Sequence, residues 1–129
     1  MIRKVGHLTV ERADPSRSVA DAARATAMLS EGVSLLFFPE GTFVRAPGIL
    51  PFRLGTFKAA VEADRPVIPV TIRGTREILP AYTWLLRRGV ITVAIGSPIK
   101  PEGTGWQEMV RLRDQVRGEI VRRSGEPAR

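Results

Sequence analysis

The segment LLFFPEGTFVRAPG, residues 35–48, places a carboxylate and a glycine directly after a run of large apolar side chains. The run from Val33 to Phe38 is apolar on both faces, as expected of a central strand in a parallel sheet. Pro39 ends this strand, Glu40 follows at once, and Gly41 lets the backbone turn with a positive φ. Ligands of open α/β sheets bind beyond the carboxyl ends of the strands, so Glu40 stands where a binding site is expected.

Alternating strand and helix patterns surround this segment. The sequence predicts strands at 7–11, 33–38, 66–72 and 90–95, and helices at 18–32, 54–64 and 106–120. Ser18, with Asp21 three residues on, has the pattern of a capping box, and Gly32 is a natural helix stop. Pro69 removes a ladder donor from the third strand, which favours a sheet edge or a bulge. The predicted fold class is α/β, with a mixed, mainly parallel sheet flanked by helices and a right-handed βαβ unit near the start.

The composition is that of a globular domain. The 129 residues are 43% hydrophobic and 26% charged, which fits one domain over residues 1–123, and we expect the tail at 124–129 to be frayed. Cysteine is absent, so the chain has no disulfide, no thiolate metal site and no cysteine nucleophile. No segment approaches the roughly 20 apolar residues that span a bilayer. We expect a cytoplasmic protein, without a metal site or a cofactor, that contacts the inner face of the membrane at most peripherally.

The charge balance favours anionic partners. The formal net charge is +7 and the sequence pI is about 11.2. Such a field attracts phospholipid headgroups, acidic carrier proteins, phosphorylated metabolites or nucleic acid. Nucleic acid is the weakest of these interpretations, because aromatic residues make up only 6% of the chain and offer few stacking platforms.

The loop after Phe38 has the composition of an anion site. Successive free N–H groups around Gly41 can form an anion-binding nest, and Thr42 adds a hydroxyl donor. Basic side chains follow at Arg45, Arg53 and Lys58. These features predict a phosphate pocket beside a carboxylate that holds a hydroxyl group or orients an arginine. The alternative is that Pro, Glu, Gly and Thr serve only as turn residues, and spacing alone leaves both interpretations open.

Three blocks of the sequence resemble the glycerophospholipid acyltransferase family, which contains 1-acylglycerol-3-phosphate O-acyltransferase. FPEGT at 38–42 is similar to the family's signature. GHLTVER at 6–12 resembles its Gly-x-x-x-Val-Asp/Glu-Arg strand. PFRLGTFKAAVEADRPVIPVTIRGT at 51–75 resembles the stretch in which a helix leads into a Pro-Val-Ile-Pro-Val strand. The blocks occur in the family's order, so the resemblance implies an incomplete domain of the glycerolipid acyltransferase type.

The resemblance also implies a reaction. In the family, a glycerol hydroxyl of a lysophospholipid attacks an acyl-CoA or acyl-carrier-protein thioester, a step of phospholipid synthesis. A histidine of a His-x-x-x-x-Asp motif takes the hydroxyl proton, a task that suits a base with a pKa near neutrality. The positions that the resemblance assigns to the acceptor are Arg12, Glu40, Gly41 and Thr42, with Arg53 and Lys58 as weaker candidates.

The sequence departs from the family at two places. Phe43 stands where the family has arginine after FPEGT, and we expect Arg45 to replace that charge by a different loop path. His7 is the single histidine, and Arg12 rather than aspartate stands five residues after it, so no catalytic residue is assigned. Two interpretations follow. One is an acyltransferase whose N-terminal part lies outside this sequence, and the other is a non-catalytic module that binds anionic lipid or an acidic acyl-carrier partner.

The segment ILPAYTWLLRRG, residues 78–89, combines aromatic, aliphatic and basic side chains. Tyr82, Trp84 and the leucines that follow stand beside Arg87 and Arg88, a composition suited to a bilayer interface. The alternative is that this segment packs beneath the sheet.

Overall fold

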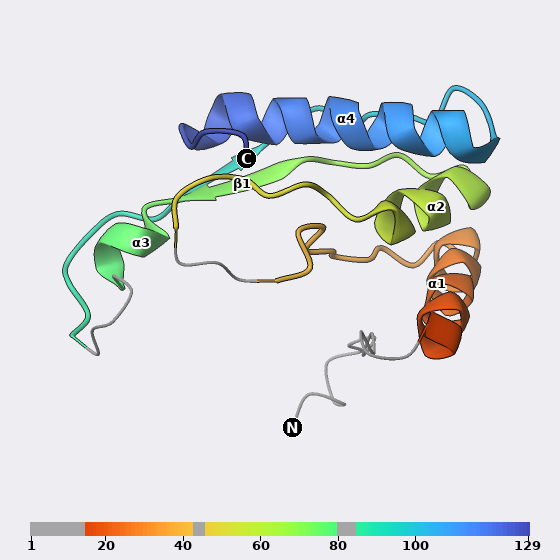
Figure 1. Cartoon of the computed structure of the whole chain (residues 1–129), viewed down its shortest axis with the longest axis horizontal. Coiled ribbons are helices and arrows are strands. Elements are labelled where there is room, and N and C mark those ends of the chain that lie inside the picture. The colour runs from red at the N-terminus through yellow and green to blue at the C-terminus, as the bar shows by residue number, and fades with distance from the viewer. Residues whose placement is uncertain (1–14, 43–45, 80–84) are drawn as a thin grey trace.

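The computed structural model describes residues 15–42, 46–79 and 85–129. The elements are α1 (Pro15–Ser30), α2 (Leu54–Glu62), β1 (Val70–Arg73), α3 (Thr75–Ile78), β2 (Thr92–Ile95) and α4 (Gly105–Ser124). Figure 1 shows the long helix α4 along one side, with β1 and α2 beneath it and α1 next to α2. The strand predicted at 7–11 lies outside the described residues.

The helices follow the predicted periodicity, with one error at a helix start. Helix α1 begins at Pro15, so the cap predicted at Ser18 is wrong. Proline suits the first helical position because it has no N–H to leave without a partner and its φ is already helical. The stop at Gly32 is confirmed: its φ is +88°, and the Val33 N–H donates to the Met28 carbonyl at 3.0 Å.

The core lies where α2 meets α4. Phe52, Phe57, Ala60 and Val61 pack against Leu112 and Val116, and both Phe57 and Leu112 are fully buried. The rings of Phe52 and Phe57 stack with centroids 6.3 Å apart. Leu112 and Val116 are four residues apart on α4, about one helical turn, in agreement with the helix predicted at 106–120. This core fixes the start of α2, and therefore the backbone at residues 50–53, against α4.

The sheet differs from the prediction. Strands β1 and β2 pair antiparallel, with Val70 opposite Ile95 and Arg73 opposite Thr92, so the described residues do not show the mainly parallel sheet that the sequence predicts. Pro69 lies between an isolated bridge at Val67 and the first residue of β1, as expected at an edge or an interruption. Its carbonyl accepts a hydrogen bond from Gly96 N–H at 2.8 Å.

The segment 33–38 is not a strand in the described structure. Leu36 and Phe38 are 77% and 75% exposed, so the predicted burial on both faces is also wrong. A strand needs a hydrogen-bonding neighbour, and no described strand pairs with this segment. The neighbour expected from the sequence, at 7–11, is outside the described residues.

The C-terminal tail, for which the sequence predicts fraying, makes hydrogen bonds to the loop at 48–49. Ile49 N–H donates to the Pro127 carbonyl at 2.9 Å, and Arg129 N–H donates to the Ile49 carbonyl at 3.1 Å. The Glu126 carboxylate accepts a hydrogen bond from Gly48 N–H at 2.7 Å. It also forms an ion pair with Arg76 at 2.9 Å. The tail therefore runs beside residues 48–49, next to the loop that the sequence singled out.

Candidate functional site

The turn at 38–42 is tied to the segment at 50–53 by hydrogen bonds. Gly41 N–H donates to the Phe38 carbonyl at 3.0 Å and closes the turn. Arg53 N–H donates to the Pro39 carbonyl at 2.9 Å, immediately before α2 begins. The Glu40 carboxylate accepts a hydrogen bond from Leu50 N–H at 2.9 Å. One carboxylate oxygen is thus held by the protein, and the orientation of Glu40 is set by the backbone at Leu50.

Gly41 and Arg53 are in close contact. Gly41 has a φ of +70°, a conformation that favours glycine. A Cβ atom at Gly41 would lie 2.5 Å from Arg53 Nε and 2.8 Å from its Cδ, so the arginine side chain passes directly over the glycine. Arg53 is exposed and makes no ion pair among the described residues. The structure therefore brings together Glu40, Gly41 and Arg53, with the exposed Thr42 next in the chain.

The other predicted residues are placed differently. Lys58 lies on α2 and makes an ion pair with Glu62 one helical turn away. The hydrogen bond from Lys58 lowers the pKa of the Glu62 carboxyl, and Thr26 of α1 donates to the same carboxylate at 3.2 Å. Lys58 thus has a partner on its own helix. Arg12 and Arg45 lie outside the described residues.

Arg117 of α4 contacts the backbone that holds Glu40. Its Nη2 donates to the Ile49 carbonyl at 2.9 Å, and its Nε donates to the Leu50 carbonyl at 3.1 Å. No sequence signal indicates this role, because Arg117 is one of several arginines on α4. Only the tertiary contact between α4 and residues 49–50 distinguishes it.

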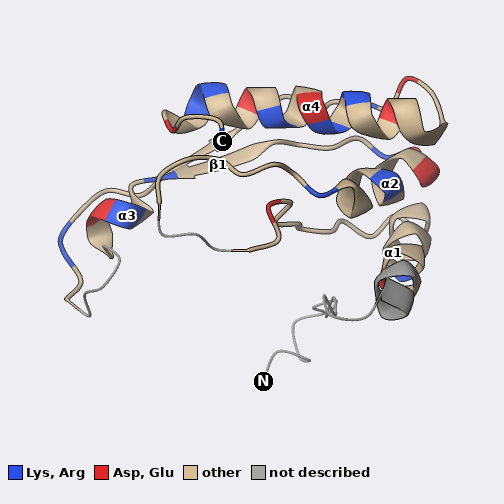
Figure 2. Cartoon of the chain, in the orientation of Figure 1, with Lys and Arg blue, Asp and Glu red and all other residues tan. Residues whose placement is uncertain are grey.

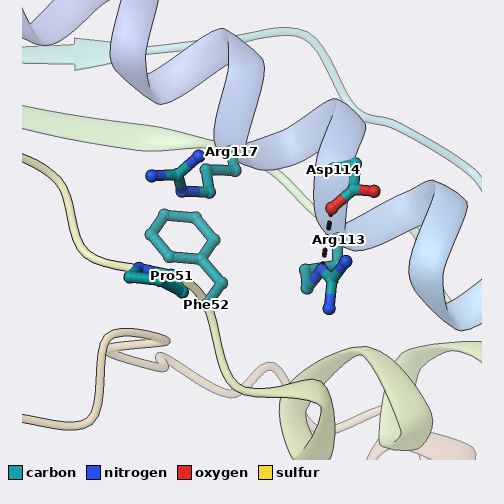
Figure 3. A pocket seen from close by; sticks show the side chains of 5 residues that line it. All are labelled: Pro51, Phe52, Arg113, Asp114 and Arg117. Atoms are coloured by element: carbon teal, nitrogen blue, oxygen red, sulfur yellow. Dashed lines mark hydrogen bonds and ion pairs between the residues drawn. The ribbon is translucent and has the colours of Figure 1, made fainter. Parts of the chain in front are cut away.

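A cavity of about 170 Å³ opens beside these contacts, lined by Pro51, Phe52, Arg113, Asp114 and Arg117. Figure 3 shows Arg113 turned to its neighbour Asp114, to which it donates at 2.8 Å. This volume is well below the roughly 300–1,000 Å³ of typical small-molecule pockets. The cavity therefore does not supply an obvious space for a lipid chain.

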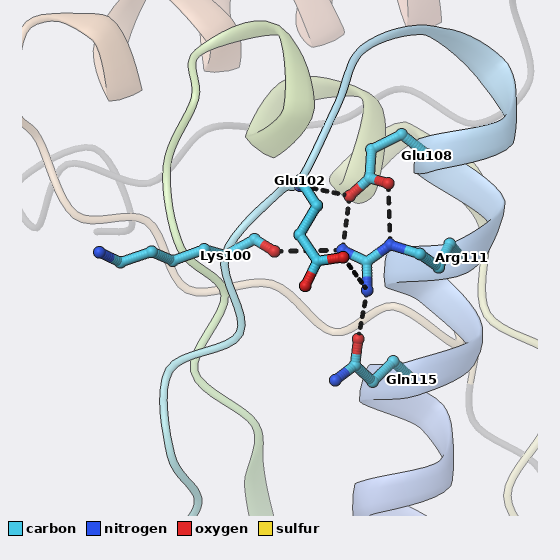
Figure 4. Close-up of polar contacts among 5 residues, drawn as sticks. All are labelled: Lys100, Glu102, Glu108, Arg111 and Gln115. Atoms are coloured by element: carbon cyan, nitrogen blue, oxygen red, sulfur yellow. Dashed lines mark hydrogen bonds and ion pairs between the residues drawn. The ribbon is translucent and has the colours of Figure 1, made fainter.

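A second polar cluster fixes the start of α4. Arg111 contacts both oxygens of Glu108, and it also reaches the Lys100 carbonyl and Gln115 (Figure 4). The hydrogen bond from Arg111, with a further one from Glu102 N–H, lowers the pKa of Glu108 to about 2. Every hydrogen-bonding partner in this cluster comes from residues 100–115. The cluster therefore holds the start of α4 in place and is not part of the site at 38–42. Among the described residues, no group of His, Asp or Glu is arranged to hold a metal ion.

The surface of the described residues carries charges of both signs and exposed apolar side chains. Along α4, acidic residues are interspersed among the basic ones (Figure 2). Leu85 and Leu86 are 78% and 74% exposed, so packing beneath the sheet is wrong for these two side chains. Tyr82 and Trp84 lie outside the described residues. Among the helices of the described chain, none has the length and apolar character to cross a bilayer.

Comparison with known proteins identifies the class. The model of the Acyltransferase family matches residues 1–73, and this chain belongs to that family. A chloroplastic 1-acyl-sn-glycerol-3-phosphate acyltransferase of Brassica napus, BAT2, is 34% identical over 96 residues, covering 74% of this chain and 28% of that protein. The 1-acyl-sn-glycerol-3-phosphate acyltransferase of Salmonella typhimurium is 31% identical over 113 residues, covering 87% of this chain and 42% of that protein.

A solved structure supports the same class. The crystal structure of the 1-acyl-sn-glycerophosphate acyltransferase PlsC from Thermotoga maritima matches with a TM-score of 0.74 and 29% sequence identity. The match covers 94% of this chain and 47% of that one. The fold is thus that of the PlsC-like glycerophospholipid acyltransferases. The chain spans about a third of the length of the first curated relatives that it matches.

Proposed function

We propose that this chain forms the acceptor side of an acyltransferase site that acts on a lysophospholipid carrying a glycerol phosphate. The observation that carries the proposal is the fixed turn at 38–42, where Glu40 is held by Leu50 N–H and Arg53 lies against Gly41. The names of the relatives support it, since those proteins are 1-acyl-sn-glycerol-3-phosphate acyltransferases.

Each residue of the turn has a role in this proposal. The Arg53 guanidinium pairs with the acceptor phosphate through its planar set of N–H donors. The other carboxylate oxygen of Glu40 accepts a hydrogen bond from an acceptor hydroxyl, and the Thr42 hydroxyl adds a hydrogen-bond donor. The acyl donor would be a thioester of coenzyme A or of acyl-carrier protein, whose acidic surface suits the net charge of +7.

Acceptor binding tests this proposal directly. A short-chain 1-acylglycerol-3-phosphate, kept below its micelle concentration, is titrated into the purified chain, and the matching 1-acylglycerol without phosphate is the ligand control. We expect the phosphate to tighten binding, and Arg53→Gln to remove that preference. Lys58→Gln is the matched basic control, because Lys58 is paired with Glu62, and its affinity should equal that of wild type. Equal affinity for the two ligands would refute the proposal.

A second candidate function is acceptor binding without acyl transfer. It is favoured because the 129 residues contain no His-x-x-x-x-Asp motif: the single histidine is not followed by aspartate five residues later. Acyl transfer from acyl-CoA and from acyl-carrier protein, measured with the same acceptor, separates the two functions. Turnover that depends on Glu40 supports the enzyme, whereas binding without turnover supports the module.

We also propose peripheral contact with an anionic membrane through residues 85–91. Leu85, Leu86 and Val90 are each more than 70% exposed, and the exposed Arg87 and Arg88 stand between them. Apolar side chains interleaved with arginines suit insertion at the headgroup level. Sedimentation with phosphatidylglycerol vesicles should fall in Leu85→Ser/Leu86→Ser. It should not fall in Trp106→Ser, a control at a large apolar residue that is 66% exposed at the start of α4, and equal losses in both variants would argue against the assignment.

A further inference from the structure

We propose that Arg117 and the C-terminal segment Glu126–Arg129 position Glu40 by bracing the peptide at Leu50. The inference rests on the proposed function, because Glu40 is assigned there to the acceptor. Two contacts meet at this one residue. The Leu50 N–H donates to the Glu40 carboxylate at 2.9 Å, and the Leu50 carbonyl accepts from Arg117 Nε at 3.1 Å.

The guanidinium fixes the direction of the Leu50 N–H. Arg117 contacts two successive carbonyls, Ile49 at 2.9 Å through Nη2 and Leu50 at 3.1 Å through Nε. Its donors form a rigid planar fork, so satisfying both carbonyls sets the rotation of the backbone between them. A lysine at this position would supply a flexible point charge without that planar constraint. The orientation of the donor to Glu40 is therefore coupled to a side chain on α4.

The C-terminal segment holds the same backbone from another direction. Ile49 exchanges hydrogen bonds with Pro127 and Arg129, at 2.9 and 3.1 Å, and Arg117 Nη2 also donates to the Arg129 main-chain oxygen at 2.8 Å. Gly48 has a φ of +125°, and a Cβ atom there would lie 2.4 Å from Arg129 Cγ. The Arg129 side chain therefore packs directly against the backbone of Gly48.

The contacts of this brace come from outside the family match. Arg117 and residues 126–129 follow the matched region, which ends at residue 73. The segment that they hold, residues 48–50, lies within it, ten residues or fewer after Glu40. A part of the chain beyond the matched region thus makes five hydrogen bonds to main-chain atoms of residues 48–50, and the Leu50 N–H among these residues holds Glu40.

Hydrogen exchange tests the brace without any ligand. Arg117→Lys is compared with Arg113→Lys, a matched control one turn earlier on α4 whose side chain donates to Asp114. Hydrogen bonds to charged groups contribute about 1.5–3 kcal/mol, so we expect the Leu50 amide to exchange at least about tenfold faster in Arg117→Lys. Unchanged exchange at Leu50, or the same acceleration in Arg113→Lys, would overturn the inference.

A double-mutant cycle tests the functional consequence. The dissociation constant of the short-chain 1-acylglycerol-3-phosphate is measured for Arg117→Lys, Glu40→Gln and the double variant. If Arg117 acts through Glu40, Arg117→Lys weakens binding in the wild-type background and adds little in the Glu40→Gln background. Additive losses would mean that Arg117 acts elsewhere and would overturn the inference. Absence of wild-type binding, together with faster Leu50 exchange in Arg117→Lys, would refute the proposed function while supporting the brace.

Discussion

Comparing Gly41→Ala with Gly32→Ala separates the loss of stability caused by backbone strain from the loss of acceptor binding caused by moving Arg53. Gly41 and Gly32 both have left-handed φ values, +70° and +88°. An alanine at either position pays about 1–2 kcal/mol in backbone strain. The two sites differ in what the new methyl group meets, since nothing lies within 4 Å of it at Gly32, whereas Arg53 Nε lies at 2.5 Å at Gly41.

The expected losses of stability are therefore similar, and the expected losses of binding are not. Arg53 is exposed and can rotate away, so we expect the two variants to differ by no more than about 0.5 kcal/mol in the free energy of unfolding. Rotation moves the guanidinium from the turn. A lost hydrogen bond to a charged group is worth about 1.5–3 kcal/mol, which corresponds to roughly a 10- to 100-fold weaker affinity for the acceptor.

The assays are urea unfolding followed by circular dichroism, and calorimetric titration with the short-chain 1-acylglycerol-3-phosphate. Gly32→Ala is the control, and it should retain wild-type affinity despite its strain. Equal affinities for Gly41→Ala and Gly32→Ala would show that the close contact between Gly41 and Arg53 has no part in acceptor binding.

Three further predictions concern stability. Leu112→Ala should lower the free energy of unfolding by about 2–5 kcal/mol in urea titrations, because Leu112 is fully buried in the core, and a loss below 1 kcal/mol would contradict the packing described. Thr71→Val should raise the melting temperature or leave it unchanged, since the buried Thr71 hydroxyl has no hydrogen-bond partner among the described residues, and a clear decrease would reveal a partner. The pKa of Glu108 is lowered from 4.5 to about 2, so its stabilising effect is present above pH 4.5 and is lost as the pH falls toward 2. Glu108→Gln should therefore show a shallower fall in melting temperature over that window, and an identical pH profile would count against the contact with Arg111.

Local signals were sufficient to predict helices α1, α2 and α4 and the turn at 38–42, but not the short helix α3. Helices α2 and α4 repeat apolar residues at helical spacing, and the stop at Gly32 needs only a residue that tolerates a positive φ. The turn after Phe38 combines an apolar run, a proline, a carboxylate and a glycine within a few residues. These features act over short distances, so a sequence displays them directly.

Long-range pairing was not predictable in the same way. An apolar run such as 33–38 is compatible with a central strand, but its neighbours decide whether it joins a sheet. The antiparallel pairing of β1 with β2 depends on the path of the chain between them. The tail at 126–129 is polar and contains proline, which suggested fraying, yet it bonds to a loop 78 residues earlier. Arg117 became identifiable only through that same tertiary arrangement.

Chemical-shift mapping is the most direct test of the acceptor site. The ¹⁵N-labelled chain is titrated with the short-chain 1-acylglycerol-3-phosphate, and the backbone amide shifts are followed. We expect the largest changes at Gly41, Thr42 and Arg53, with a smaller change at Leu50 and little along the start of α4. Changes centred on the cavity at Arg113, or no saturable change at all, would contradict the assignment of the 38–42 turn to the acceptor.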